Sequence, residues 1–309
     1  MSIEEMHNAV KKDFLGRQVV VTVSRGSRPH DNVHPRAQKV VPPEKCFFCP
    51  GNEHLTPPEI DRIEKDGKWE IRCFPNKFPA FDKGSKKAYG WHDVIVETPD
   101  HMKTISELSV DNLFDYLAMV KRRMAAAAAD PKLKYVCVFK NEGKAAGASL
   151  EHSHSQVVAM DFVPKHVQKV GKKASAFAAM PTKQEKNIFL QNEQFAAVCP
   201  KISRFPLEFW LLPKFRVASL VELDDSQLRS LAAILKSSLA AFDAATGFGP
   251  YNIVFHSAPI GQKDFQFHLQ ILPRMANWAG FEFATEIVMT SSTPQMSVAS
   301  LRKAAEGQK

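Results

Sequence analysis

Apolar and polar positions recur with different periods along the chain, and these periods predict the order of its strands and helices. In residues 110–129, apolar side chains recur three and four positions apart, directly after Ser109, a residue type that caps helices. A long helix is therefore expected there. Runs of β-branched and aromatic residues, bounded by proline or glycine turns, are typical of strands. Such runs predict strands at residues 17–24, 69–74, 91–97 and 134–139, with Asp66-Gly67 as a hairpin turn.

The second half of the chain repeats this order. A strand is expected at 208–212, a capped helix at 225–245, and strands at 251–256 and 266–272. Strand, long helix, strand, loop and histidine-bearing strand thus occur twice, which indicates an internal duplication. We divide the chain into an N-terminal unit, residues 1–175, and a C-terminal unit, residues 185–309.

Two further segments have weaker patterns. Residues 165–186 are rich in Lys, Ala and Gln, so a poorly ordered connector between the units is expected. Residues 3–15 predict a short helix.

Composition narrows the class of protein. The chain has 309 residues, of which 44% are hydrophobic and 24% charged, as in ordinary globular proteins. No apolar run approaches the roughly 20 residues of a membrane helix, and the N-terminus lacks the apolar core of a signal peptide. A cytoplasmic protein without a membrane partner is expected.

The net charge of +8 does not by itself indicate nucleic acid. The lysines are dispersed, and the densest cluster, residues 165–173, contains no aromatic side chains for stacking on bases. Small phosphorylated ligands explain a modest basic excess equally well, so no nucleic-acid partner is expected.

The cysteines point to a metal rather than to disulfides. Five cysteines, an odd number, occur in a large chain without a signal peptide. Cys46-x-x-Cys49 is half of a tetrahedral zinc site, and His101 and His152 are candidates for the other two ligands. The alternative is two thiols near a turn without a metal. In the second half, His256 and His268 lack a further ligand because Gln270 stands in its place, so a second metal is doubtful.

Candidate chemistry concentrates in residues 141–160, where a loop of small residues precedes an alternating segment. In a strand, His152, His154 and Gln156 would share one face. A neutral histidine is a good nucleophile toward phosphorus, and the phosphoramidate that it forms can transfer the group onward. His154 fits that role, Gln156 can donate to a phosphoryl oxygen, and Ser149 with the backbone at Gly147 can hold the neighbouring phosphate. The alternative is a surface strand that carries these residues by chance.

These residues resemble the active-site segment of the galactose-1-phosphate uridylyltransferase family, a branch of the histidine-triad superfamily. The resemblance extends over most of the chain. It is carried by Arg25-Gly-Ser-Arg28-Pro29, Cys46-Phe-Phe-Cys49-Pro50, Phe74-Pro-Asn76, Thr98-Pro-Asp-His101, Asn141-Glu-Gly, Gly147-Ala-Ser149, His152-Ser-His154-Ser-Gln156, Phe255-His-Ser-Ala-Pro259 and Gly280-Phe-Glu282.

The resemblance implies an α+β fold of two tandem histidine-triad-like units, with mixed, largely antiparallel sheets that form half-barrels flanked by helices. It also implies ping-pong nucleotidyl transfer. His154 would attack the α-phosphorus of a nucleotide sugar and release a hexose 1-phosphate, and a second sugar phosphate would then take the nucleotidyl group.

The resemblance further implies the roles of individual residues. Gln156 would bind the transferred phosphoryl group and Ser149 the neighbouring phosphate. Glu282 would face the sugar, from the partner subunit of a homodimer. A structural zinc would be held by Cys46, Cys49, His101 and His152, and the nucleotide site would be lined by Arg25, Arg28, Phe47, Asn76, Asn141 and Gly147.

The chain departs from the commonest family motif, His-Pro-His-Gly-Gln, by having Ser153 and Ser155 between its active-site residues. This serine form resembles ADP-glucose phosphorylase, a member that transfers adenylyl groups.

Three functions therefore compete. The first, which the family resemblance favours, is a uridylyltransferase that transfers the nucleotidyl group between UDP-hexoses and hexose 1-phosphates. The alternative is an adenylyltransferase or phosphorylase using ADP-glucose or a dinucleoside polyphosphate. The third, a non-catalytic nucleotide-binding protein, would have no need of His154 with Gln156.

Overall fold

The computed structural model describes residues 10–22, 41–276 and 278–307. The first half contains β1 (Val10–Lys12), β2 (Gln18–Val21), β3 (Asp61–Lys65), β4 (Lys68–Pro75), β5 (Gly90–Val96), α2 (Val110–Ala127), β6 (Tyr135–Glu142) and β7 (His154–Met160). The second half contains α3 (Lys165–Gly171), α4 (Ala174–Ala178), α5 (Met180–Lys183), β8 (Ile188–Gln191), β9 (Phe195–Val198), β10 (Phe209–Pro213), α6 (Asp225–Thr246), β11 (Tyr251–His256), β12 (His268–Pro273), α7 (Gly280–Thr285), β13 (Val288–Thr290) and α8 (Pro294–Glu306).

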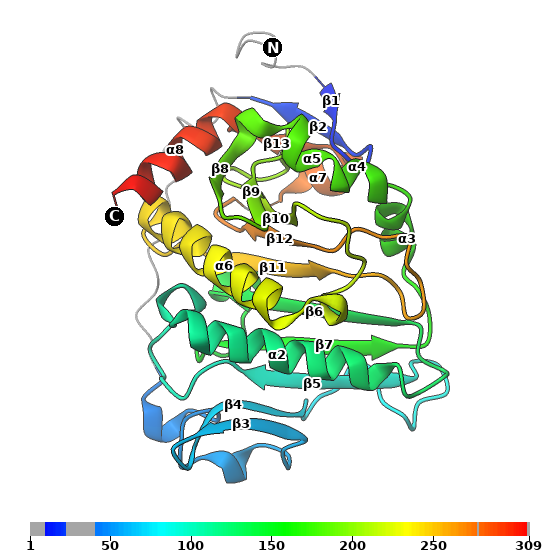
Figure 1. The fold of residues 1–309 in the computed structure, drawn as a ribbon, viewed down its shortest axis with the longest axis vertical. Helices are drawn as coiled ribbons and strands as arrows, with labels where there is room; N and C mark the ends of the chain where they lie inside the picture. Colours follow the sequence, from blue (N-terminus) through cyan, green and yellow to red (C-terminus); the bar gives the residue numbers. More distant parts are fainter. Residues whose placement is uncertain (1–9, 23–40, 277, 308–309) are drawn as a thin grey trace.

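One ten-stranded sheet runs through both halves, in the order β3-β4-β5-β7-β6-β11-β12-β10-β9-β8 (Figure 1). Every neighbouring pair in it is antiparallel. The strand order of the first half is mirrored in the second half about the β6–β11 pair, as a duplicated chain requires. At that junction Asn141 lies opposite Asn252, so backbone hydrogen bonds join the two predicted units. The expected α+β class is confirmed.

Helices α2 and α6 lie side by side across one face of this sheet (Figure 1). The Ser109 hydroxyl accepts from the backbone N–H of Asn112, and Asp224 caps α6 together with Gln227. Their apolar faces bury residues such as Leu117 and Leu235 against the sheet in the largest core cluster. The apolar periodicity therefore predicted both helices correctly, with ends displaced by no more than two residues.

The opposite face of the sheet carries two smaller apolar clusters. Over the first half, Phe48, Phe74 and Val94 pack around Cys46 and Cys49. Over the second half, Val167, Val170, Phe177 and Met180 from α3, α4 and α5 pack on the sheet. The expectation of a poorly ordered connector at 165–186 is therefore wrong. Its apolar residues, three positions apart among lysines, make short helices that bury one face.

The helix expected at residues 3–15 is also wrong where the chain is described, because Val10–Lys12 forms strand β1. This strand pairs with β2, and β2 pairs in parallel with β13 from the far end of the chain. Such long-range pairing overrides a weak local helical preference. The pattern also missed β8, β9 and α8.

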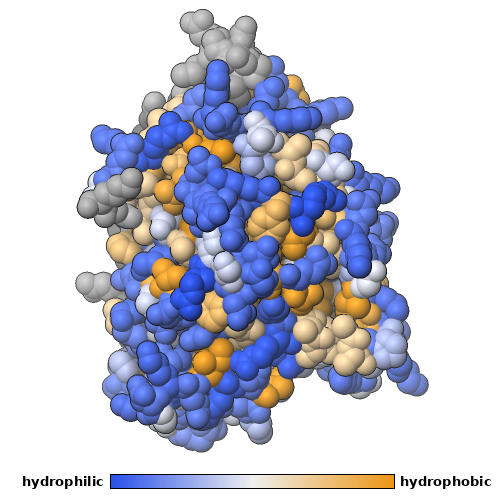
Figure 2. All heavy atoms as spheres, in the orientation of Figure 1, coloured by the Kyte–Doolittle hydropathy of each residue, from blue (hydrophilic) through white to orange (hydrophobic). Residues whose placement is uncertain are grey.

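Hydrophilic side chains cover most of the face viewed in Figure 2, and apolar ones occur in small separate groups. No helix in the described residues has the length and hydropathy needed to cross a membrane.

Candidate active site and metal centre

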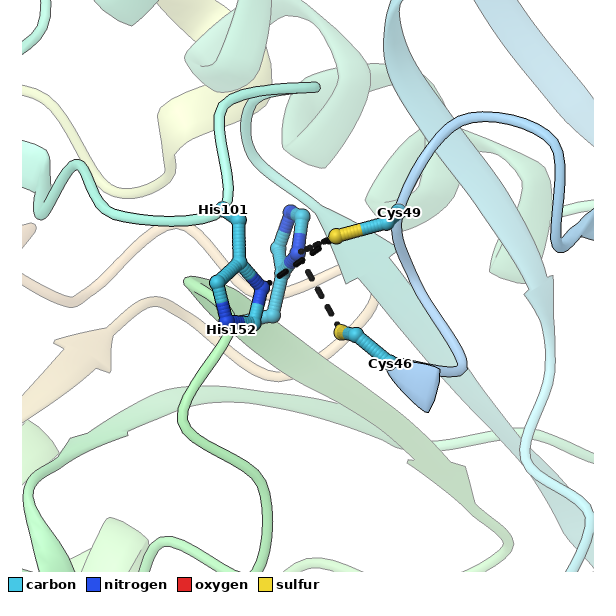
Figure 3. A group of neighbouring side chains, drawn as sticks. All are labelled: Cys46, Cys49, His101 and His152. Atoms are coloured by element: carbon cyan, nitrogen blue, oxygen red, sulfur yellow. Dashed lines mark hydrogen bonds between the residues drawn. The ribbon is translucent and has the colours of Figure 1, made fainter. Parts of the chain in front are cut away.

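Cys46, Cys49, His101 and His152 converge in the structure although more than 100 residues separate the first from the last (Figure 3). All four are buried, and their ligand atoms lie within 4.8 Å of one another. The Nδ1 atom of His152 lies 3.5 Å from both sulfur atoms, and Nδ1 of His101 lies 3.2 Å from Cys49 Sγ. A tetrahedral zinc with bonds of about 2.3 Å to sulfur and 2.0 Å to nitrogen would separate S and N by about 3.5 Å.

The hydrogen bonds of His101 and His152 leave the nitrogen atoms that face the two thiols able to bind a metal. His101 Nε2 donates to the Val41 carbonyl at 2.8 Å, and His152 Nε2 donates to the Thr98 carbonyl at 2.7 Å. Both Nδ1 atoms therefore carry lone pairs and face the thiols, as metal-binding imidazoles do. Two sulfurs and two such nitrogens fit a structural zinc, and the geometry supports a metal site over two thiols near a turn.

His154 is the first residue of β7, two positions beyond His152, but its ring has a different environment. Its Nδ1–H donates to the His152 carbonyl at 2.8 Å, which leaves Nε2 with the lone pair. The ring is buried beside Phe48, with ring centroids 5.3 Å apart. Burial, and then the positive charge of Lys140, lower the pKa of His154, so the imidazole is neutral near pH 7. A neutral imidazole with one free nitrogen has the properties of a nucleophile.

Gln156 follows His154 on the same face of β7 and is half-buried. Its Oε1 atom lies 2.8 Å from Nε2 of His92, a buried residue of β5. His92 and Asn76 also line a cavity of about 400 Å³ where β4 ends and β5 begins. No local pattern in the sequence pointed to His92, because its contact with Gln156 depends on the pairing of β5 with β7.

The loop between β6 and β7 is held by the second half of the molecule. Asn252 of β11 donates to both Asn141 Oδ1 and the Ala146 carbonyl at 2.8 Å, and Asn141 Nδ2 donates to the Gly147 carbonyl at 3.4 Å. Gly147 has a φ of 88°, a left-handed conformation in which a residue with a Cβ is strained. Asn141 thus holds the loop that carries exposed Ser149, and Asn252 was not anticipated from the sequence.

A buried polar network contacts Ser153 and Ser155 on the face of β7 that packs against α2. Glu97 accepts from Lys140 Nζ at 2.8 Å, from Ser153 Oγ at 2.6 Å and from Ser155 Oγ. Lys140 Nζ also donates to the His154 carbonyl at 3.4 Å. The Glu97 and Lys140 side chains have no solvent exposure.

The protonation states of this network follow from the pair itself. Although burial opposes ionisation, Lys140 and the two serines hold the pKa of Glu97 below its usual value. Burial likewise opposes the charge on Lys140, but the carboxylates of Glu97 and Glu142 raise its pKa. The pair is therefore ionised, and the serines at the positions of Pro and Gly in the commoner motif serve as hydrogen-bond donors to it.

The structure places the remaining predicted site residues as follows. Phe47 is 46% exposed, whereas its neighbour Phe48 is the phenylalanine that contacts His154. Asn76 is half-buried, with Nδ2 3.3 Å from His92 Nε2. The Glu282 carboxylate accepts from the Ala279 N–H at the start of α7, among exposed Phe281 and Phe283. Arg25 and Arg28 lie outside the described residues.

The class of protein follows from this arrangement and from the comparison with protein families. A family model described as the N-terminal domain of galactose-1-phosphate uridyl transferase matches residues 2–164, more than half of the chain. A second model, a domain of unknown function, matches residues 89–305. The chain belongs to the galactose-1-phosphate uridyl transferase family of nucleotidyltransferases, within the histidine-triad superfamily, as the motif resemblance implied.

Individual relatives differ in the nucleotide that their names give. The chain is 28% identical to ADP-glucose phosphorylase from Arabidopsis thaliana over 323 residues, covering 95% of this chain and 92% of the relative. It is 29% identical to galactose-1-phosphate uridylyltransferase from Haemophilus influenzae over 290 residues, covering 84% and 82%. The crystal structure of an A. thaliana ADP-glucose phosphorylase with bound ADP-glucose superposes with a TM-score of 0.85 at 27% identity, covering 96% of this chain and 98% of that one.

Proposed function

We propose that the protein transfers a nucleotidyl group by a ping-pong mechanism through a covalent nucleotidyl-His154 intermediate. The observation that carries the proposal is the hydrogen bond from His154 Nδ1 to the His152 carbonyl, 2.8 Å long. That bond fixes the tautomer in which Nε2 holds the lone pair. The same bond orients the ring relative to the strand, so the nucleophile does not have to be deprotonated or rotated before it reacts.

Neither of the two nucleotidyl transfers requires an acid to protonate its leaving group. Nε2 of His154 forms a bond to the α-phosphorus of a nucleotide sugar, and the bond from that phosphorus to the bridging oxygen breaks, which releases a hexose 1-phosphate. In the second step an oxygen of an acceptor phosphate attacks the same phosphorus and the bond to Nε2 breaks. Both leaving groups, a phosphate oxygen and a neutral imidazole, depart without prior protonation.

The binding roles expected from the family resemblance are part of this proposal. Gln156 donates to the phosphoryl group under attack, and Ser149 binds the neighbouring phosphate with the backbone of Gly147. The nucleotide lies against Arg25, Arg28, Phe47, Asn76 and Asn141, while Glu282 of the partner subunit contacts the sugar in a homodimer. Cys46, Cys49, His101 and His152 hold a structural zinc that anchors the loop before β7 but takes no part in the chemistry.

For the substrate, we propose ADP-glucose as nucleotide donor and orthophosphate as acceptor, which yields glucose 1-phosphate and ADP. Two observations support this choice. The similarity to ADP-glucose phosphorylase extends over nearly all of both chains, in sequence and in structure. In addition, Ser153 and Ser155 are used as donors to Glu97, so the serine motif belongs to a network that Pro and Gly cannot form. Uridylyl transfer from UDP-glucose to a hexose 1-phosphate is the second candidate, supported by the uridylyltransferase relatives.

The experiment is covalent labelling without an acceptor. The protein is incubated with ADP-glucose or UDP-glucose labelled in the phosphate attached to the nucleoside, and the adduct is quantified by intact mass and by its lability to acid. We expect an adenylyl adduct on the wild-type protein and none on His154→Ala. Orthophosphate should then release the label as ADP, whereas galactose 1-phosphate should release it slowly.

His268→Asn is the matched control, because His268 has the same position and Nδ1 hydrogen bond on β12 in the second half. It should label like the wild type. Preferential labelling by UDP-glucose, with release by galactose 1-phosphate, would favour the second candidate. Labelling of His154→Ala, or failure of both donors to label the wild type, contradicts the mechanism.

A further inference from the structure

His92 has its hydrogen-bonding roles set by the backbone of the segment that follows β4. The Ala80 N–H points at His92 Nδ1, with a separation of 3.2 Å. A backbone N–H can only donate, so Nδ1 must hold the lone pair. Burial lowers the pKa of His92, which keeps the ring neutral. In a neutral ring with an accepting Nδ1, the proton is on Nε2.

The position of that proton decides the orientation of the Gln156 amide. The Gln156 atom 2.8 Å from His92 Nε2 must be an acceptor, which is the carbonyl oxygen Oε1. The NH2 group of Gln156 therefore points away from His92, and no acceptor within the described residues lies in hydrogen-bond reach of it. The more distant Asn76 Nδ2, 3.3 Å from His92 Nε2, cannot donate to this nitrogen, because His92 Nε2 carries the proton that it donates to Gln156.

The second half shows what happens when the orienting residue is an acceptor. Gln156 lies opposite Val94 in the β5–β7 pair, and Gln270 lies opposite Trp210 in the β10–β12 pair. Glu208 precedes Trp210 by two residues, as His92 precedes Val94. Gln270 Nε2 donates to Glu208 Oε1 at 2.8 Å, so this amide has the reverse orientation.

The remaining end of the Gln270 amide is also occupied. Its Oε1 atom lies 3.1 Å from His256 Nε2. Gln270 thus has both ends of its amide engaged within the protein and offers no donor to a ligand. The two glutamine amides differ in orientation because the residue two positions before the cross-strand partner is a donor, His92, in one half and an acceptor, Glu208, in the other.

We propose that His92 is a positioning residue for nucleotidyl transfer, which holds the Gln156 amide with its two N–H donors directed at the phosphoryl group on His154. This inference rests on the proposed function, because it gives Gln156 a phosphoryl oxygen to bind. In the transition state that oxygen gains negative charge, and a donor already aimed at it stabilises the charge without reorganisation. Without His92, Gln156 could present its carbonyl oxygen to the phosphate, which repels it.

The test uses three replacements of His92 and the single-turnover rate of adduct formation at saturating nucleotide sugar. His92→Gln keeps an N–H donor near the position of Nε2 and should retain most of the rate. His92→Leu removes the donor and should slow the step about tenfold, and His92→Glu introduces an acceptor, like Glu208, and should slow it about a hundredfold. The concentration of nucleotide sugar at half-maximal rate should change little, because His92 acts through Gln156.

A double-mutant comparison separates positioning from general damage to the fold. In a Gln156→Ala background, His92→Leu should have no further effect on the rate. Equal rates for His92→Leu, His92→Glu and wild type, or a full additional loss in the Gln156→Ala background, would overturn the inference while leaving transfer through His154 intact. Failure of the wild-type protein to form any adduct overturns both.

Discussion

The two halves of this molecule use the same strand geometry for His154 and His268 but give them different surroundings. Each histidine is the first residue of its strand, and each donates Nδ1–H to the carbonyl two residues earlier, at 2.8 and 2.9 Å. The ring of His268, however, is stacked between Phe177 and His256, with centroid separations of 4.1 and 4.5 Å. The duplicated backbone therefore selects the same tautomer in both halves, with the lone pair on Nε2 of the histidine. Side chains from other elements determine whether a substrate can reach that nitrogen.

The halves differ equally on the face of the strand that packs against the helices. In the first half, this face carries Ser153, Ser155 and Lys140. The corresponding positions in the second half are Phe267, Leu269 and Phe255. The first half thus has a Cys2His2 cluster and an ionised network beside its proposed nucleophile, whereas the second half packs apolar side chains on the corresponding face of the strand. Buried charges require mutual compensation, so the first half should be much more sensitive to single replacements.

The largest effect is expected from loss of the proposed metal site, whose Cys2His2 cluster has no counterpart among the described residues of the second half. Cys46→Ser should reduce bound zinc from about one equivalent per chain to none and lower stability by several kcal/mol. Zinc content by elemental analysis and thermal unfolding measure the two effects. Cys199→Ser, a buried cysteine of the second half, controls for loss of a buried thiol and should keep its zinc. Unchanged zinc in Cys46→Ser would exclude these four residues as the site.

A smaller effect is expected from breaking the buried Lys140–Glu97 pair. Glu97→Ala leaves the Lys140 ammonium without its nearest counter-charge and should cost about 3–5 kcal/mol in urea unfolding. Replacing the pair together, as Glu97→Leu with Lys140→Met, makes this face resemble that of the second half and should restore part of the loss. Glu142→Gln, which alters the other and more exposed partner of Lys140, should cost less than Glu97→Ala, because the amide oxygen can still accept from Lys140. Equal losses in the single and double replacements would show that charge compensation is not the cause.

The smallest effect is the pH dependence that His268 contributes from the second half. Burial lowers the pKa of His268 to about 4, below an unfolded value of about 6.5. Its contribution to stability is then complete above pH 6.5 and is lost as the pH falls toward 4, because the unfolded state binds the proton first. His268→Asn should therefore flatten the decline in stability over this range, by at most about 1.4 kcal/mol per pH unit. A wild-type slope in His268→Asn would contradict the assignment.

Much of the fold was predictable from the sequence because helix and strand periodicity depends on neighbours within a few residues. Helices α2 and α6 and the strands around them follow from such patterns. The prediction failed where burial depends on distant partners. Strand β1 pairs with β2 in a sheet that also includes β13, and the lysine-rich helices α3 to α5 pack on the large sheet.

The chemistry of the site divides in the same way. The sequence alone determined which residue types we propose to react or to bind metal, since His154, Gln156 and the Cys46-x-x-Cys49 pair stand in short motifs whose spacing has chemical meaning. Only the tertiary structure decided how those groups are oriented. The tautomer of His92 depends on the Ala80 N–H, and the charge behind β7 depends on Glu97 meeting Lys140, 43 residues away. Hydrogen-bond direction is a property of which donor faces which acceptor, and strand pairing brings those partners together from parts of the chain that no local pattern connects.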